Sequence, residues 1–81
     1  MEMNERLKIF ADISGLTQYR ISKDVGLSTA AINLVFKGES GLSMKSLVRL
    51  KSAYPNLNLN WLIAGEGNII QKRRNTRAYK G

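Results

Sequence analysis

The side chains in this sequence that can do chemistry are carboxylates, hydroxyls, amides and cations, because its 81 residues include neither cysteine nor histidine. This composition excludes a disulfide scaffold, a zinc site made of thiolates or imidazoles, and a nucleophile activated by histidine. The six carboxylates are scattered along the chain and form no acid–base pair; they belong to Glu2, Glu5, Asp12, Asp24, Glu39 and Glu66. We therefore expect no enzymatic activity, no metal ion and no cofactor.

Positive charge is concentrated near the end of the sequence. The chain has 13 lysines and arginines against 6 aspartates and glutamates, and the net charge of +7 favours a polyanionic partner. Residues 1–67 carry eight basic and six acidic side chains, whereas residues 68–81 carry five basic and no acidic ones. We interpret residues 1–67 as one folded domain and residues 68–81 as a basic tail, which is either an arm that follows phosphates or a linker. The net charge by itself does not identify the folded part as a nucleic-acid-binding domain.

No stretch of the sequence is typical of a membrane span. The longest apolar run is four residues, at positions 61–64, whereas a spanning helix needs about 20. The first five residues are acidic and polar, unlike a secretory signal. We therefore expect a cytoplasmic protein with no membrane partner.

Apolar residues at helical spacing predict five short helices in one compact all-α domain. The helices are expected at residues 4–14, 17–25, 28–37, 43–54 and 58–64. The side chains placed to cap their starts are Thr17, Ser28, Ser43 and Asn58. The residues placed to end them are Gly15, Gly26, Gly38, Gly65 and Pro55. The side chains expected to face the core from the fourth helix are Met44, Leu47, Leu50 and Tyr54. Residues 68–70 are the one candidate strand.

The stretch from residue 18 to residue 37 indicates a particular pair of helices. Gly26 lies between them, where a positive φ is easiest to adopt, and Ser22 is small enough to let the helices cross closely. The apolar side chains that such a pair would share as a core are Ile21, Val25, Leu27, Ile32 and Val35. These features together predict a helix-turn-helix, whose second helix is presented to the major groove of DNA.

Residues 16–38, which read LTQYRISKDVGLSTAAINLVFKG, resemble the helix-turn-helix of lambda-type phage repressors, Cro proteins and the wider XRE-like family. Leu42, Leu47 and Leu50 resemble that family's fourth helix, and residues 58–65 resemble its short fifth helix, so the resemblance covers about residues 4–67. It implies a five-helix lambda-repressor-like fold and a sequence-specific regulator of transcription. The implied partner is double-stranded DNA, in which a prophage-type repressor binds a palindromic operator as a dimer, in association with the bacterial nucleoid.

The resemblance also implies which residues contact DNA. The side chains expected at base edges, on the recognition helix of residues 28–37, are Thr29, Ala30, Asn33 and Leu34. An asparagine can both donate to and accept from adenine, and the methyl groups of the other three can touch thymine methyls. The side chains expected at phosphates are Gln18, Tyr19, Ser28, Lys37, Ser40 and Ser43. Backbone N–H groups at the helix starts would add further donors.

Two positions depart from the family pattern. Many members pair an arginine on the first helix with a glutamate on the third, whereas this chain has Ala11 and Phe36 there. An apolar pair is physically coherent, because buried ion pairs are often no more stable than apolar replacements. The recognition face also lacks glutamine and arginine, so the readout of sequence is expected to lean on methyl contacts and DNA shape.

The sequence predicts a dimer contact, and it does not decide between the repressor and three rival functions. The apolar patch expected to join two copies consists of Trp61, Ile63, Ile69 and Ile70, although Trp61 is equally expected in the core. One rival is an antitoxin, which binds a toxin protein as well as its promoter. Another is a protein-interaction module of the same fold, and a third is non-specific nucleic-acid binding by the basic tail alone.

Overall fold

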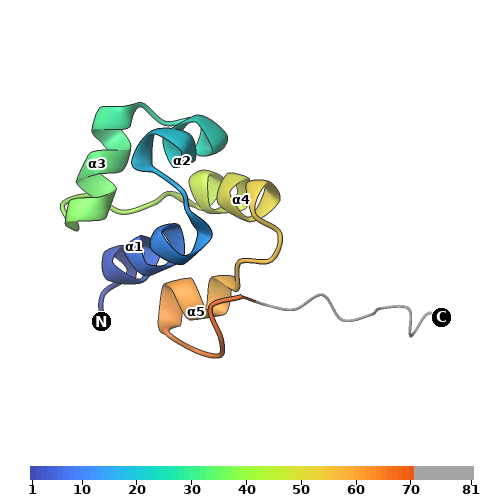
Figure 1. Ribbon diagram of the computed structural model, residues 1–81. Coiled ribbons are helices and arrows are strands. Elements are labelled where there is room, and N and C mark those ends of the chain that lie inside the picture. Colours follow the sequence, from blue (N-terminus) through green and yellow to red (C-terminus); the bar gives the residue numbers. More distant parts are fainter. Residues whose placement is uncertain (71–81) are drawn as a thin grey trace.

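The computed structural model describes residues 1–70, in which five α-helices follow one another (Figure 1). They are α1 (Met3–Ser14), α2 (Gln18–Val25), α3 (Thr29–Lys37), α4 (Met44–Ala53) and α5 (Leu59–Ala64). The all-α prediction is confirmed for this part of the chain, and the bounds agree with the expected ones to within a residue. Residues 71–81, which hold most of the predicted basic tail, lie outside the described residues.

Local side-chain contacts explain where the helices begin. The four expected caps are confirmed: the side-chain oxygens of Thr17, Ser28, Ser43 and Asn58 accept hydrogen bonds from backbone N–H groups in the first turns of α2 to α5. α1 begins with a capping box that was not predicted from the sequence. There the Glu5 side chain accepts from the N–H of Glu2 at 2.8 Å, while the Glu2 side chain accepts from a backbone N–H of the first turn.

The helix ends also follow the prediction. Gly15, Gly26, Gly38 and Gly65 each follow a helix in the left-handed conformation, with φ between 68° and 82°. α4 stops at Ala53, before the proline. Beyond it the ammonium of Lys51 donates to the carbonyls of Pro55 and Leu57, at 2.6 and 2.8 Å, and so holds the connection to α5.

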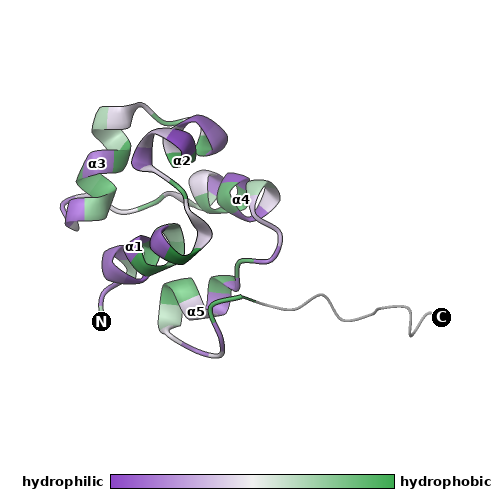
Figure 2. Cartoon of the chain, viewed as in Figure 1, coloured by the Kyte–Doolittle hydropathy of each residue, from purple (hydrophilic) through white to green (hydrophobic). Residues whose placement is uncertain are grey.

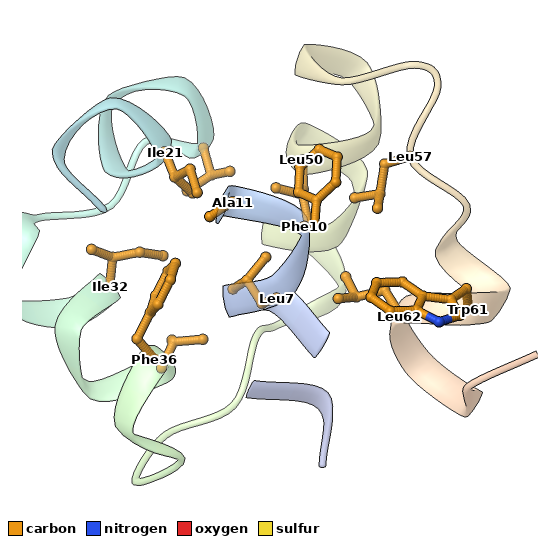
Figure 3. Packing of buried hydrophobic residues seen from close by; sticks show 12 residues of the cluster. Leu7, Phe10, Ala11, Ile21, Ile32, Phe36, Leu50, Leu57, Trp61 and Leu62 are labelled. Carbon is orange, nitrogen blue, oxygen red and sulfur yellow. The ribbon is translucent and has the colours of Figure 1, made fainter. Parts of the chain in front are cut away.

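The helices pack around one apolar core. α2 packs against α3 and α4, and α1 packs against α3 and α5 (Figure 1). Figure 3 shows the core side chains converging from all five helices and from the connection before α5. They are Leu7, Phe10, Ala11, Ile21, Val25, Ile32, Val35, Phe36, Leu50, Leu57, Trp61 and Leu62. The predicted shared core of α2 and α3 is therefore buried, except that Leu27 is half-buried, and Ala11 and Phe36 both lie in the apolar interior.

The structure contradicts one expectation about an apolar residue and decides between two alternatives for another. Met44 does not face the core, because its side chain is 74% exposed. α4 buries Ser46 and Leu50, and the first residue of the helix points away from that side. Trp61, which was expected either in the core or in the patch between copies, packs in the core and is only 9% exposed (Figure 3).

The rest of the expected patch is only partly on the surface. Ile63 is 50% exposed and Ile70 is 39% exposed, whereas Ile69 is partly buried against the core. Residues 68–70 do not form a strand but make a single antiparallel bridge, Leu57 with Ile70, beside a hydrogen bond of 2.9 Å from the N–H of Asn58 to the carbonyl of Ile69.

A buried arginine joins the beginning of the domain to its last helix. Arg6 is 9% exposed, and its Nε and Nη2 donate to the carbonyls of Leu62 and Ile63 at 2.8 and 3.0 Å. A third donor, Nη1, bonds the carbonyl of Met1. The guanidinium therefore satisfies carbonyls at the C-terminal end of α5, where the helix dipole also favours a cation.

Candidate nucleic-acid interface

The expected base-facing side chains lie on one side of α3. Thr29 and Ala30 are exposed in its first turn and Leu34 is 41% exposed, whereas Ile32 and Phe36 are buried on the opposite side. Asn33 is half-buried beside them. We call this side, with Thr29, Ala30, Asn33 and Leu34, the α3 outer face. In Figure 2 α3 is mostly green and white, with isolated purple bands, because Lys37 is the one charged side chain of the helix.

A side-chain hydrogen bond connects this face to the start of α2. The Nδ2 of Asn33 donates to the Oε1 of Gln18 at 3.2 Å. The two residues are 15 positions apart, and the fold brings them together because α2 and α3 pack against each other. A residue expected at bases and one expected at phosphates thus form a single unit.

The contact with Gln18 leaves Asn33 able to recognise a base. A primary amide has two N–H donors and one carbonyl acceptor, so one donor and the acceptor remain after the bond to Gln18. If the bond to Gln18 uses the N–H on the far side from Oδ1, the remaining pair matches the N7 acceptor and the N6 amino donor of adenine. The bond also restricts the rotamers of both side chains, which lowers the entropy that binding would cost.

The expected phosphate-contacting hydroxyls are not equally free. Ser28 uses its oxygen to accept from the N–H of Ala31 at 3.0 Å, which leaves its O–H hydrogen available. Ser43 accepts from the N–H of Ser46 at 3.1 Å and also donates to the hydroxyl of Ser46 at 3.2 Å. The Ser43 hydroxyl therefore has less hydrogen-bonding capacity left for a phosphate than its position suggests.

Ser40 lies in an electrostatically unfavourable place for an anion. It is exposed in the loop after α3, and it lines a shallow hollow together with Glu2 and Glu39. Two carboxylates around one hollow repel phosphate, so Ser40 is the weakest of the expected phosphate contacts.

The cations around α2 are divided between free and neutralised ones. Tyr19 is 60% exposed, and the ammonium of Lys23 lies 5.3 Å from the centre of its ring and 3.4 Å from its hydroxyl. Lys37 is exposed at the end of α3. Arg20, in contrast, makes an ion pair with Asp24 at 3.1 Å, the one ion pair found within residues 1–70.

Asp24 remains charged next to Arg20. A hydrogen bond from the hydroxyl of Tyr54 and the nearby Arg20 guanidinium lower the pKa of this carboxyl, although partial burial opposes them. The carboxylate therefore offsets one positive charge on the side of α2. Lys23 and Lys37 are left as the exposed, unneutralised cations of the α2–α3 pair.

The turn between α2 and α3 is covered by Arg49, a contact that was not predicted from the sequence. Gly26 has φ 75°, and a Cβ atom there would overlap the guanidinium of Arg49 on α4. Arg49 also donates to the carbonyl of Val25, at a long 3.5 Å. Nothing near position 49 in the sequence signals this contact, because it depends on how α4 packs against α2.

Two other kinds of site are absent from the described part of the chain. No group of three or more histidine, cysteine, aspartate or glutamate side chains is gathered there to hold a metal ion. None of the helices within residues 1–70 has the length and apolar character needed to cross a membrane. Comparisons with protein-family models, with curated proteins and with solved structures found no match to this chain.

Proposed function

We propose that this protein is a sequence-specific regulator of transcription, of the lambda-repressor-like helix-turn-helix type, which binds double-stranded DNA through the α3 outer face. In this proposal α2 and α3 are the two helices of the motif, and repression follows from occupying an operator. The protein would act in the cytoplasm, on the nucleoid. Neither catalysis nor a cofactor is part of this function.

One observation carries the proposal: the hydrogen bond between Gln18 and Asn33. It places an amide that can read adenine beside a second amide at the N-terminal end of α2, where backbone N–H groups favour a phosphate. The exposed Thr29 and Ala30 lie one turn before Asn33, on the same side of α3. A surface that combines base-reading and phosphate-binding groups in this way suits the major groove.

A dimer is part of the proposal because helix-turn-helix domains commonly read two half-sites about one helical turn apart. Ile63 and Ile70 are the exposed apolar residues near α5 that remain available for such a contact. A two-fold interface uses the same patch on both copies, so a small patch can serve both partners.

Selection of random duplex DNA by the purified 81-residue chain tests the proposal. The selection is run at about 150 mM salt, where purely electrostatic binding is weakened. The expected result is an enriched palindrome with half-sites about 10 bp apart. Gln18→Ala and Asn33→Ala should each weaken binding to that duplex, whereas Lys8→Ala, on the exposed side of α1, should not. Binding of every duplex alike would contradict the proposal.

Deleting residues 71–81 separates this function from binding by the basic tail. This segment carries five basic side chains and no acidic ones. A chain that reads an operator with its α3 outer face should keep its sequence preference after the deletion and lose affinity and salt dependence. A chain that binds through the tail alone should lose all DNA binding.

A second candidate function is a protein-interaction module of the same fold, either an antitoxin or a domain without a DNA partner. The observation that favours it is the apolar character of the α3 outer face, where Leu34 is 41% exposed and Lys37 is the nearest charge on the helix. In that case Leu34→Asp would abolish binding of a protein partner, and the selection on random duplex DNA would enrich no sequence.

A further inference from the structure

The outer side of α4 combines exposed apolar side chains with positive charge. Met44 and Val48 lie one helical turn apart and are 74% and 57% exposed. Lys45 and Arg49 are exposed beside them, and the helix contains no acidic residue. We call this side, with Met44, Lys45, Val48 and Arg49, the α4 outer face. Because α4 packs against α2 through its other side, the α4 outer face is open to solvent in the described part of the chain.

The outer side of α1 has the opposite charge. Glu5 and Asp12, two helical turns apart, are exposed on one side of the helix, and Ile13, which follows Asp12, is 58% exposed. Lys8 is the one cation exposed on this side, so the two carboxylates outnumber it. We call this side, with Glu5, Lys8, Asp12 and Ile13, the α1 outer face.

Asp12 and Lys45 carry the charges that are available for a contact between the two faces. The one ion pair found within residues 1–70 joins Arg20 and Asp24, so neither Asp12 nor Lys45 is paired in the described part of the chain. Both side chains are exposed, so they do not meet within one copy. Each has an exposed apolar neighbour, so the two faces match in charge and in apolar character.

We propose that the α4 outer face of one copy binds the α1 outer face of a second copy, with Lys45 opposite Asp12 and Val48 against Ile13. The contact joins two different surfaces, so every bound copy leaves one of each open, and further copies can add head to tail. It is separate from the two-fold contact at Ile63 in the proposed dimer, and it does not require DNA.

The contact should be weak. Two short helix faces bury less surface than a standard protein interface, and exposed ion pairs contribute little. The net charge of +7 also makes copies repel each other, although salt at about 0.15 M screens charges that are more than about 8 Å apart. We expect a dissociation constant of about 0.1–1 mM. The head-to-tail contact is then absent at the micromolar concentrations at which the proposed dimer through Ile63 is measured.

Charge-reversed variants of the 81-residue chain test the proposal, in an Ile63→Asp background that removes the two-fold contact. Lys45→Glu and Asp12→Lys should each weaken self-association at least about fivefold, because each replaces an attraction with a repulsion. Self-association is measured from the concentration dependence of amide shifts in ¹H–¹⁵N spectra, in salt at about 0.15 M. The same spectra show whether each variant is folded. Unchanged self-association of either variant would overturn the proposal.

Lys8→Glu is the matched control for the net charge. It changes the net charge by the same amount as Lys45→Glu, but it removes the one cation from the α1 outer face. We expect Lys8→Glu to strengthen self-association about two- to threefold, whereas Lys45→Glu weakens it. Effects of the same sign would show that the net charge, and not the pairing of the two faces, sets the association.

A mixture of two variants distinguishes a contact between unlike faces from a face that pairs with itself. The Lys45→Glu variant keeps its α1 outer face, and the Asp12→Lys variant keeps its α4 outer face. When unlabelled Asp12→Lys is added to labelled Lys45→Glu, we expect shifts of the α1 amides around Asp12, although each variant alone associates poorly. No shift in the mixture would overturn the proposal. These measurements contain no DNA, so their failure would leave operator binding untouched.

Discussion

The hydroxyl of Tyr54 donates a hydrogen bond of 2.5 Å to the Oδ2 of Asp24, and so ties the end of α4 to α2. The same carboxylate oxygen accepts from the Nε of Arg20 at 3.1 Å, and the ring of Tyr54 packs edge-on against Phe10 in the core. Burial of Tyr54, followed by its bond to Asp24, raises the pKa of the phenol well above its usual range. The pKa of Asp24 moves in the opposite direction, chiefly because of Tyr54.

The first prediction concerns the pH dependence of this contact. A lowered carboxyl pKa contributes stability above the unfolded pKa of about 3.9, and this stability is lost as the pH falls through the folded value. A raised phenol pKa contributes stability that is complete below about pH 10 and is lost as the pH rises through the folded value. The difference in unfolding free energy between the wild type and Tyr54→Phe should therefore be largest between about pH 5 and 9 and shrink at both ends.

Urea unfolding at several pH values measures that difference. Tyr19→Phe is the control, because Tyr19 is 60% exposed and its loss should change the unfolding free energy by no more than about 0.5 kcal/mol at any pH. A difference between the wild type and Tyr54→Phe that stays constant from pH 3 to pH 10.5 would show that the hydroxyl does not act through Asp24.

The second prediction concerns Arg6. Arg6→Met keeps much of the side-chain length but leaves the carbonyls of Leu62 and Ile63 without their donor. The variant loses hydrogen bonds from a charged donor and leaves buried acceptors unsatisfied, so we expect the unfolding free energy to fall by about 2–4 kcal/mol. Lys8→Met, an exposed position of the same helix, should cost no more than about 0.5 kcal/mol. Equal unfolding midpoints for the two variants would contradict this role of Arg6.

The third prediction compares two glycines that end helices. Gly15 and Gly26 have φ of 68° and 75°, so alanine at either position should cost about 1–2 kcal/mol in unfolding free energy. Gly26→Ala should cost more, because Arg49 must move away, whereas a Cβ at Gly15 meets no atom within 4 Å. Adding Arg49→Ala should make alanine at position 26 cost about as much as at Gly15. An additional loss that persists in this background would mean that Arg49 is not its cause.

The fourth prediction concerns the bond between Gln18 and Asn33. If the two amides act as one unit on DNA, the losses in binding free energy for Gln18→Ala and Asn33→Ala should not add. We expect a coupling of about 0.5–3 kcal/mol in a double-mutant cycle on the selected duplex. Thermal unfolding of the three variants shows whether they remain folded. Strict additivity would mean that the two side chains act independently.

The fifth prediction concerns self-association. Ile63→Asp places a charge at an exposed apolar position of α5 in the proposed dimer contact, so it should lower the dimer fraction in sedimentation velocity and weaken binding to a palindrome more than to a single half-site. Val48→Asp is the control, because Val48 is 57% exposed on α4, outside that contact. Loss of dimer in both variants alike would place the contact elsewhere.

The helix boundaries could be predicted from the sequence because each depends on nearby residues. Thr17, Ser28 and Ser43 cap the helix that starts immediately after them. The glycines that end four helices act through their own φ. The exposed side of α3 was predictable for a similar reason, since the helical period places Ile32 and Phe36 opposite Ala30 and Leu34.

The contacts between distant residues could not be predicted. Arg6 bonds a residue 56 positions away, Asn4 bonds the carbonyl of Phe36 at 32 positions, and Tyr54 reaches Asp24 at 30. Spacing along one helix carries no information on these pairs, because they depend on how whole helices pack. The same limitation explains Met44 and Trp61, whose positions depend on which side of α4 and α5 faces the core.

For the candidate site, the sequence predicted which residues lie on the surface but not the hydrogen bond between two of them. Asn33 and Gln18 were expected at a base and at a phosphate, and the structure shows them bonded to each other. The hydrogen bond from the Ser43 hydroxyl to Ser46 could not be predicted either, because two serines three residues apart are also typical of a first helical turn whose side chains face solvent.

The contact of Arg6 with the end of α5 bears on the order in which the helices separate when the domain unfolds. It joins residues 56 positions apart, whereas the bond between α2 and α3 joins residues only 15 apart. Closing the longer loop costs more chain entropy, so we expect α5 to dock after α2 and α3 have paired and to leave before they separate. Amide protons of α5 should therefore exchange with deuterated water sooner than those of α2 and α3. In the proposed dimer, a second copy bound at Ile63 would slow that exchange, so protein concentration would set how firmly the last helix is held.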